Sequence, residues 1–181
     1  MSGHSHWHNI KFKKELTDKK RGKTLSKVSR LITVAVKEKG ADPEMNPKLK
    51  LAIERAKEVN VPKDNIEKAI QRGLGKTEGS QMEEILYEAY GPAGVALIIE
   101  GITDNKNRTI AEVRHILTKF GGTLAESGSV RYMFDKKGAE WLPKYPLEVS
   151  DDKTKKQLEN LFEALDENDD IQEIYSNLKN F

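Results

Sequence analysis

The sequence contains no cysteine among its 181 residues. Disulfide scaffolds, thiol nucleophiles and cysteine metal sites are therefore excluded, and the composition fits a reducing compartment. Aromatic residues are scarce at 7%, and no apolar run approaches the roughly 20 residues that span a bilayer. The first residues, MSGHSHWH, lack the apolar stretch of a signal peptide. We therefore expect a cytoplasmic protein that does not bind a membrane.

A large net charge is also missing, since 31 Lys and Arg nearly balance 29 Asp and Glu to leave +2. The balance is uneven along the chain. Residues 1–80 carry 19 basic and 10 acidic side chains, a net +9, whereas residues 81–181 carry 12 and 19, a net −7. A basic half attracts polyanions, most strongly at low salt. The first half is therefore where we expect a contact with nucleic acid.

Apolar residues in the first half recur at three- and four-residue steps, which predicts three helices over residues 24–37, 47–59 and 62–73. Asn46 and Pro47 have the chemistry of an N-cap followed by proline at the first helical position. We predict a basic helical domain over residues 1–75 and a glycine-containing linker over residues 76–82.

The second half follows a different pattern, and we predict one α+β domain over residues 83–181. Two strands, 84–90 and 95–102, are separated by a Gly-Pro-Ala-Gly turn, and a helix capped by Asp104 and Asn105 follows them. A strand over 129–134, an irregular connection over 138–150, a helix from about residue 151 and a last strand over 170–176 complete the order β-β-α-β-α-β. The predicted fold class is α+β: a three-helix domain, then a small sandwich whose antiparallel or mixed sheet is covered on one face by helices.

The segment 3–14 combines histidines, aromatic rings and cations. Lysine and arginine neutralise phosphates, and rings stack on bases, so this mixture suits RNA or DNA. A solvated N-terminal tail is the competing interpretation. The spacing of His4, His6 and His8 also permits metal binding on an extended segment, but no acidic or thiol ligand stands nearby, and we expect neither a metal nor another cofactor.

Cations continue onto the first predicted helix, where Lys20, Lys23, Lys27 and Arg30 are three or four residues apart. This spacing places them along one side of the helix, opposite its apolar stripe. A charge run is often only a solvated face, but few acids interrupt this one, which favours a surface for polyanions. If the helices pack as a bundle, Lys63, Lys68, Arg72 and Lys76 extend that surface.

We find no motif for catalysis. The run Gly73 to Thr77 has neither the spacing nor the preceding strand of a phosphate loop. The polar residues 104–109 are explained as a capped helix start. Because no nucleophile and base, and no pair of carboxylates, stand in a catalytic arrangement, we expect neither an enzyme nor a small-molecule substrate.

Eight motifs together resemble the YebC/PmpR family, whose mitochondrial relatives include a translational activator of cytochrome c oxidase. They are GHSHWHNIK at 3–11, KRGK at 20–23, NPKL at 46–49, AIQRG at 69–73, YEAYGP at 87–92, TDNKNRT at 103–109, GG at 121–122 and GSV at 128–130. The resemblance implies a helical domain followed by an α+β domain into which a third domain is inserted. Here only residues 139–150 separate the last matching segment from a closing helix and strand. We therefore expect the insertion to be missing and replaced by a short connection, as the close ends of an inserted domain permit.

The resemblance implies either a DNA-binding transcriptional regulator or a ribosome-associated factor that supports translation. We favour a ribosomal RNA partner and a role in elongation, because helix 48–59 mixes glutamates with its cations and offers few side chains that read bases. DNA binding is the alternative, and a scaffold acting through the acidic half is a third class. The candidate contact residues are His4, Trp7, Asn9, Lys11, Lys14, Lys20, Arg21, Lys23, Lys27, Arg30 and Arg72. His6 and His8 depart from the family pattern. If these histidines contact phosphate, we expect binding to strengthen below about pH 6.5, because imidazole gains a positive charge there.

Overall fold

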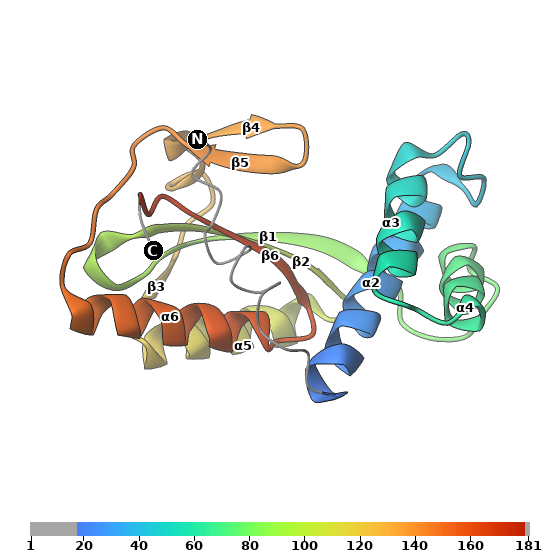
Figure 1. Ribbon diagram of the computed structural model, residues 1–181, viewed down its shortest axis with the longest axis horizontal. Helices are drawn as coiled ribbons and strands as arrows, with labels where there is room; N and C mark the ends of the chain where they lie inside the picture. Colours follow the sequence, from blue (N-terminus) through green and yellow to red (C-terminus); the bar gives the residue numbers. More distant parts are fainter. Residues whose placement is uncertain (1–17, 180–181) are drawn as a thin grey trace. The chain divides into compact units, whose positions relative to one another are not determined.

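The computed structural model describes residues 18–179, with side chains from residue 22 onward. Within this range the chain forms two compact units (Figure 1). The helical unit comprises residues up to 84 together with 102–104, and the α+β unit comprises residues 85–101 and 105 onward. No helix in the described range is both long enough and apolar enough to cross a membrane.

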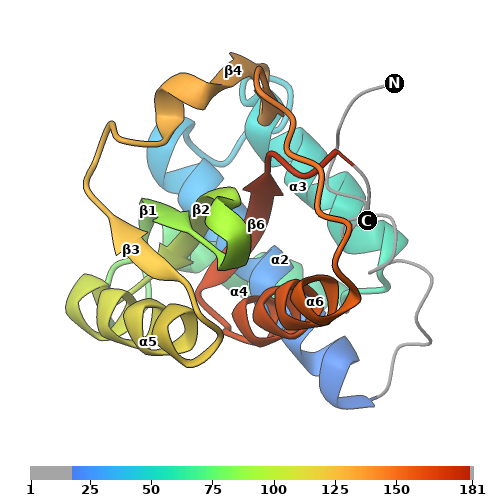
Figure 2. The ribbon, with the colours of Figure 1, turned by 90° about the vertical axis from the view of Figure 1, so that its left-hand side faces the viewer.

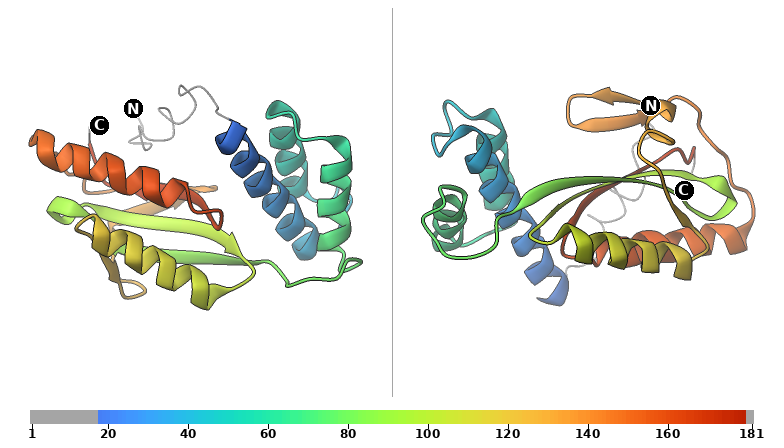
Figure 3. Two further views of the ribbon diagram at one scale, coloured as in Figure 1. Left: turned by 90° about the horizontal axis from the view of Figure 1, so that it is seen from below. Right: turned by 180° about the vertical axis from the view of Figure 1, so that it is seen from behind.

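Three helices build the helical unit: α2 (Asp18–Lys39), α3 (Pro47–Glu58) and α4 (Lys63–Gly73). The structure confirms the predicted helices, although α2 already includes residue 18. α2 packs against both α3 and α4 (Figure 3). Their shared core consists of Val28, Ile32, Ala35, Val36, Leu49, Ala52, Ala56, Val61 and Ala69. These residues follow helical spacing, so their burial accounts for the periodicity of the sequence.

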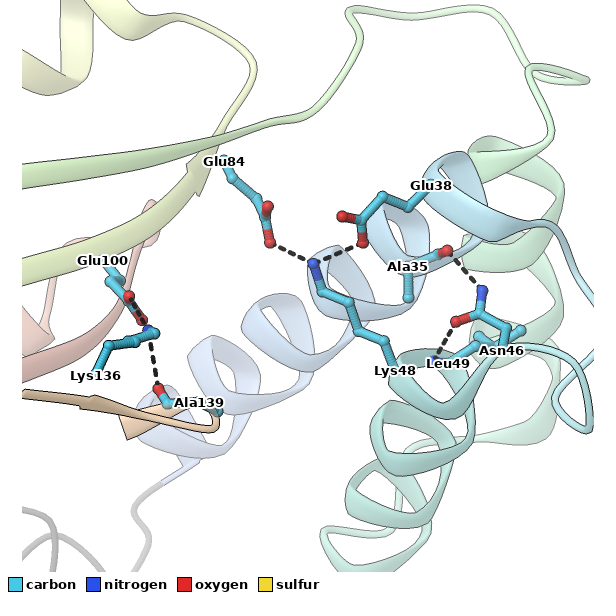
Figure 4. A network of polar contacts seen from close by, with 9 residues as sticks. All are labelled: Ala35, Glu38, Asn46, Lys48, Leu49, Glu84, Glu100, Lys136 and Ala139. Carbon is cyan, nitrogen blue, oxygen red and sulfur yellow. Dashed lines mark hydrogen bonds and ion pairs between the residues drawn. The ribbon is translucent and has the colours of Figure 1, made fainter. Parts of the chain in front are cut away.

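Asn46 joins α2 to α3 through both halves of its side-chain amide. Its oxygen accepts a hydrogen bond from the Leu49 amide at 3.1 Å and so caps α3, as the sequence predicts. Its nitrogen donates to the carbonyl of Ala35 at 2.7 Å (Figure 4) and to the carbonyl of Gly40 at 2.9 Å. The side chain is fully buried, and these bonds satisfy its amide group while they tie the start of α3 to the end of α2.

The α+β unit is built on a four-stranded sheet in the order β3-β1-β2-β6. Its strands are β1 (Glu83–Tyr90), β2 (Ala96–Thr103), β3 (Thr123–Ala125) and β6 (Ile171–Ser176). β3 pairs antiparallel with β1, and β6 pairs antiparallel with β2. A short turn over Pro92–Gly94 joins β1 to β2. The predicted hairpin and the predicted last strand are therefore confirmed.

The two faces of the sheet are covered differently. α5 (Lys106–Lys119) and α6 (Asp152–Asp166) lie side by side on one face, over a core that includes Leu97, Ile99, Val113, Leu117 and Leu161 (Figures 1 and 2). The hairpin of β4 (Phe134–Lys137) and β5 (Glu140–Pro143) lies on the opposite face, over a second cluster. The α+β class is confirmed, with helices on one face as expected.

The hairpin is tied to the sheet by polar contacts as well as by this apolar cluster. Lys136 Nζ lies 3.0 Å from Glu100 Oε1 on β2 (Figure 4). Trp141 Nε1 donates a hydrogen bond to the same oxygen at 2.7 Å. The ammonium of Lys136 also stands 4.5 Å from the centre of the Trp141 ring. The carbonyl of Ala139, at the hairpin turn, accepts a hydrogen bond from the Tyr175 hydroxyl of β6 at 3.1 Å. The turn is therefore held to the sheet.

The predicted strand over residues 129–134 is wrong, and β3, β4 and β5 were not predicted. Val130 and Phe134 are buried, but Tyr132 between them is 62% exposed, and the backbone forms a turn over 127–130 followed by the short helix Arg131–Met133. The cause lies on β1, where Glu88 is only 2% exposed. Its carboxylate accepts hydrogen bonds from the amides of Gly128 at 2.7 Å and of Val130 and Arg131 at 2.8 Å each. Amides that converge on one carboxylate are not available for a strand ladder.

Glu88 also accepts a hydrogen bond from the Arg131 guanidinium at 2.8 Å. Burial raises the pKa of Glu88, but the three amides and the guanidinium outweigh burial and lower the pKa below its ordinary value of 4.5. The charged form therefore stabilises the fold. This stabilisation is complete above about pH 4.5 and is lost as the pH falls toward the lower native pKa.

We predict that Glu88→Gln lowers the free energy of unfolding by about 2–4 kcal/mol near neutral pH, because an amide group would face amide donors. The difference from the wild type should shrink in acid, as the wild-type carboxylate becomes protonated. Urea unfolding followed by circular dichroism at several pH values measures both effects. Glu126→Gln, in the exposed part of the same loop, is the matched control. A constant difference down to about pH 3 would contradict the role of the charge.

Candidate nucleic-acid interface

The residues predicted to contact nucleic acid fall into three groups in the structure. His4, Trp7, Asn9, Lys11 and Lys14, like His6 and His8, lie outside the described residues. Lys20 and Arg21 belong to α2, but their side chains are not described. The remaining four, Lys23, Lys27, Arg30 and Arg72, have described side chains in the helical unit. The geometry of the site is therefore built from these four and their neighbours.

Lys27 differs from the expectation of an exposed basic row along α2, because only 7% of the residue is exposed. The sequence shows one apolar stripe on this helix, but α2 is covered on a second side. Leu31 and Val34 belong to a separate cluster with Met82 and Ile102, which lie beyond the third helix in the sequence. Lys27 precedes these two residues at helical spacing and shares their side of α2. It is therefore not positioned as an exposed phosphate ligand.

A groove of about 290 Å³ lies between α2 and α4 in the helical unit. Each helix contributes four positions at spacing i, i+3, i+4 and i+7, which is one face of a helix. The lining residues are Ser26, Ser29, Arg30 and Thr33 of α2, Asn65, Lys68, Ala69 and Arg72 of α4, and Met82. The groove therefore brings Arg30 and Arg72, which are 42 positions apart in the sequence, to one site.

The lining of the groove is cationic and polar. Arg30, Lys68 and Arg72 supply three positive charges, and no residue that lines the groove carries a carboxylate. The Arg30 guanidinium donates a hydrogen bond to the carbonyl of Ile102 at 2.8 Å, which fixes its orientation. Thr33 Oγ1 lies 3.0 Å from the Ser29 carbonyl and 3.1 Å from the Ala69 carbonyl, so it connects the two helices. This arrangement attracts anions and offers no nucleophile paired with a base.

Lys48 shows that not every cation of the helical unit has such surroundings. Its ammonium lies 2.8 Å from Glu38 and 2.6 Å from Glu84 (Figure 4). Partial burial lowers the pKa of Lys48, but hydrogen bonds to these two carboxylates outweigh burial and raise it. The charge of Lys48 is compensated within the unit, whereas the residues that line the groove include three cations and no acid.

Gly73, the last residue of α4, sets how closely α4 approaches α2. A Cβ atom at this position would lie 2.6 Å from the Thr33 carbonyl oxygen and 2.6 Å from Val36 Cβ. Both distances are shorter than van der Waals contact, so only glycine allows this approach. Because Thr33 lines the groove, the glycine also determines the shape of the groove.

Within the polar segment 104–109, residues 105–109 belong to the α+β unit and serve its structure, in agreement with the structural interpretation of the sequence. Asn105 caps α5 by accepting a hydrogen bond from the Arg108 amide at 3.1 Å. Thr109 Oγ1 donates to Asp170 at 2.6 Å, and the Arg108 guanidinium lies 2.9 Å from the same carboxylate. These contacts connect the start of α5 to the segment before β6. Within the described residues no cluster of histidines or acids could hold a metal ion.

The sequence could have revealed more of the groove than we inferred. Lys68 was expected to extend the basic surface, but Ser26, Ser29, Thr33 and Asn65 were missed. The signal was present as two polar stripes with identical helical spacing, one on α2 and one on α4. A stripe of serine and threonine on one helix does not identify the helix that it faces, so tertiary packing was needed.

The fold and the groove define a two-unit α+β protein with an anion-attracting site in its helical unit. The chain belongs to the TACO1/YebC family. Residues 5–76 match the TACO1/YebC protein N-terminal domain, and residues 82–140 and 139–178 match the TACO1/YebC second and third domain. The family predicted from the sequence motifs is thus confirmed.

Individual relatives agree with this assignment. A protein of Petrotoga mobilis named "Probable transcriptional regulatory protein" is 52% identical over 174 residues, which cover 96% of this chain and 69% of the relative. A protein of the same name from Persephonella marina is 39% identical, with 99% of this chain and 96% of the relative covered. The crystal structure of a conserved hypothetical protein from Aquifex aeolicus aligns with a TM-score of 0.88 at 35% identity, covering 97% of each chain.

Substitutions at two glycines test how the helical unit is packed. We predict that Gly73→Ala lowers the free energy of unfolding by about 1–3 kcal/mol, because the added methyl group forces α4 away from α2. Gly22→Ala in α2 is the matched control, since a Cβ atom there meets nothing within 4 Å. That change should raise stability by about 0.5–1 kcal/mol through the higher helix propensity of alanine. Urea unfolding of both variants measures the difference, and equal effects would contradict the close approach at Gly73.

Proposed function

We propose that this protein is a non-enzymatic regulatory factor that binds nucleic acid through its helical unit. The observation that carries the proposal is the concentration of positive charge there, including a groove lined by three cations and no carboxylate. The first 80 residues have a net charge of +9, while the remainder has −7. A polyanion is therefore attracted to one part of the chain and repelled by the other. The names of the relatives, probable transcriptional regulatory proteins, are consistent with this function.

For the partner we propose ribosomal RNA, with a role in translation elongation in the cytoplasm. A helix that reads DNA usually presents several base-reading side chains in the major groove. On α3 the exposed face includes Glu54 and Glu58, and Leu51 is 67% exposed. Acids on such a face would be repelled by the phosphates of a duplex. Phosphate contacts alone do not require a recognition helix and suit a folded RNA surface.

DNA binding is the second candidate, and the names of the relatives favour it. On that alternative the protein would regulate transcription from discrete sites. Specific DNA sites are commonly bound about a thousandfold or more above random duplex. A footprint on promoter DNA with that preference would replace the ribosomal proposal.

We further propose that the β4–β5 hairpin stands where longer members of the family carry an inserted third domain. The family model for the second and third domain matches in two pieces that meet at residues 139 and 140, at the hairpin turn. The alignment with the Persephonella marina relative has 240 positions, more than the 181 residues of this chain, and so requires gaps in this chain. Any activity that depends on the inserted domain is not expected here.

Co-sedimentation with ribosomes tests the proposed partner. We predict that the wild-type protein sediments with ribosomes at low salt and is released as salt increases, because phosphate contacts release counterions. Reversing the charge of Lys11, Lys14, Arg21 and Lys23 should abolish sedimentation. Reversing four cations of the α+β unit, Lys137, Lys144, Lys153 and Lys156, is the control with the same change in net charge and should have a much smaller effect. A wild-type protein that stays in the supernatant at low salt would contradict the ribosomal partner.

A further inference from the structure

We propose that the groove between α2 and α4 is a discrete phosphate-binding site that holds one phosphate of a nucleic-acid backbone. Arg30, Lys68 and Arg72 are its charged ligands, and Ser26 and Asn65 are its neutral ones. This assignment goes beyond a diffuse positive field, because it names one location and a stoichiometry of one. The identity of the phosphate as part of a nucleic acid rests on the proposed function, whereas the binding of an anion in the groove does not.

The size of the groove favours a small group. Pockets that enclose drug-sized ligands measure roughly 300–1,000 Å³, and this groove, at about 290 Å³, lies just below that range. A groove of this size has room for a phosphate with some of its water.

The chemistry of the lining favours phosphate among small anions. Arginine guanidinium groups present parallel donors that match the oxygens of phosphate, and lysine adds a point charge. Two arginines and a lysine come from two helices and converge on one space without a competing carboxylate in its lining. Ser26 adds a hydroxyl donor and Asn65 adds an amide donor, so the site offers neutral hydrogen bonds beside the charged ones.

Part of this site is fixed before any ligand arrives. Arg30 is partly buried, and its bond to the Ile102 carbonyl holds the guanidinium in place. The Thr33 hydroxyl and the close approach at Gly73 fix α4 on α2. A preorganised cation loses less conformational entropy on binding than a freely rotating one. Lys68 and Arg72 are exposed and complete the site from the solvent side.

The position of the groove along α2 favours a polymer over a free phosphate compound. Lys23 precedes Arg30 by seven residues on α2, which corresponds to about 10 Å along a helix. Phosphates of nearby nucleotides in one strand are separated by distances of this order. A strand with one phosphate in the groove can therefore place another beside Lys23.

Two double variants of the full chain test the site with the same change in net charge. Lys68→Gln with Arg72→Gln removes two exposed cations from the groove without touching Arg30, whose loss could disturb the fold. Lys57→Gln with Lys63→Gln removes two exposed cations of α3 and α4 that do not line the groove. Thermal unfolding should show that both variants are folded.

The first measurement uses inorganic pyrophosphate as the probe, titrated at low salt and followed by amide chemical shifts. We expect saturable binding of one pyrophosphate by the wild type and the control variant, with the largest shifts over residues 26–33 and 65–72. The groove variant should lose this binding. The absence of saturable binding by the wild type, or its retention by the groove variant, would overturn the site.

The second measurement compares the affinity of the same proteins for a single-stranded RNA. We expect the groove variant to bind about tenfold more weakly than the control variant, because charge-assisted hydrogen bonds are lost in addition to charge. Equal weakening of both variants would show a diffuse field and overturn the site while leaving the proposed function intact. A wild type that binds pyrophosphate but neither this RNA, nor ribosomes, nor duplex DNA would keep the anion site and overturn both its assignment to a backbone phosphate and the proposed function.

Discussion

The packing of α4 against α2 is the constraint on which the helical unit and its groove depend. Glycine at position 73 lets the backbone of α4 reach the Thr33 carbonyl, and the Thr33 hydroxyl reaches the Ala69 carbonyl. The apolar sides of both helices are then buried together, and the polar stripes beside them form the groove. Cations on separate helices repel one another, so apolar burial must offset the cost of bringing Arg30, Lys68 and Arg72 together. The packing is thus responsible for both stability and charge concentration.

Features that depend on local sequence were predicted well. The caps at Asn46 and Asn105, the helical repeat of α3 and α4, and the turn between β1 and β2 each depend on residues within one or two turns of chain. The amide of Asn46 also bonds to Ala35 and Gly40, which no local pattern indicates. Local sequence patterns thus predicted the helices, caps and turns, but not the hydrogen bonds that join one element to another.

Features that depend on distant residues were missed. Residues 129–134 alternate like a strand, but a buried carboxylate on β1, about 40 positions earlier, gathers their amides into a turn. The burial of Lys27 was also missed, and this residue lies on the side of α2 that carries the cluster with Met82 and Ile102. The groove combines two stripes that are separately visible in the sequence but whose proximity is a tertiary property. The sequence alone therefore identifies the basic residues, whereas the packing of the helices determines which of them lie together in the groove.

The β4–β5 hairpin limits which surfaces of this chain are available to a nucleic-acid partner. Its turn is held by Tyr175, and Trp141 and Lys136 are bound to Glu100, so the sheet face beneath it is covered by the hairpin itself. With a covered sheet and 12 basic against 16 acidic side chains over residues 85–101 and 105–181, a net −4, the α+β unit has little attraction for a polyanion. The helical unit has both the charge and a preformed groove. On our proposal a nucleic-acid partner is held by the helical unit. Discrimination among partners would then come from how several phosphates are spaced relative to the groove, since phosphate contacts by themselves carry no sequence information.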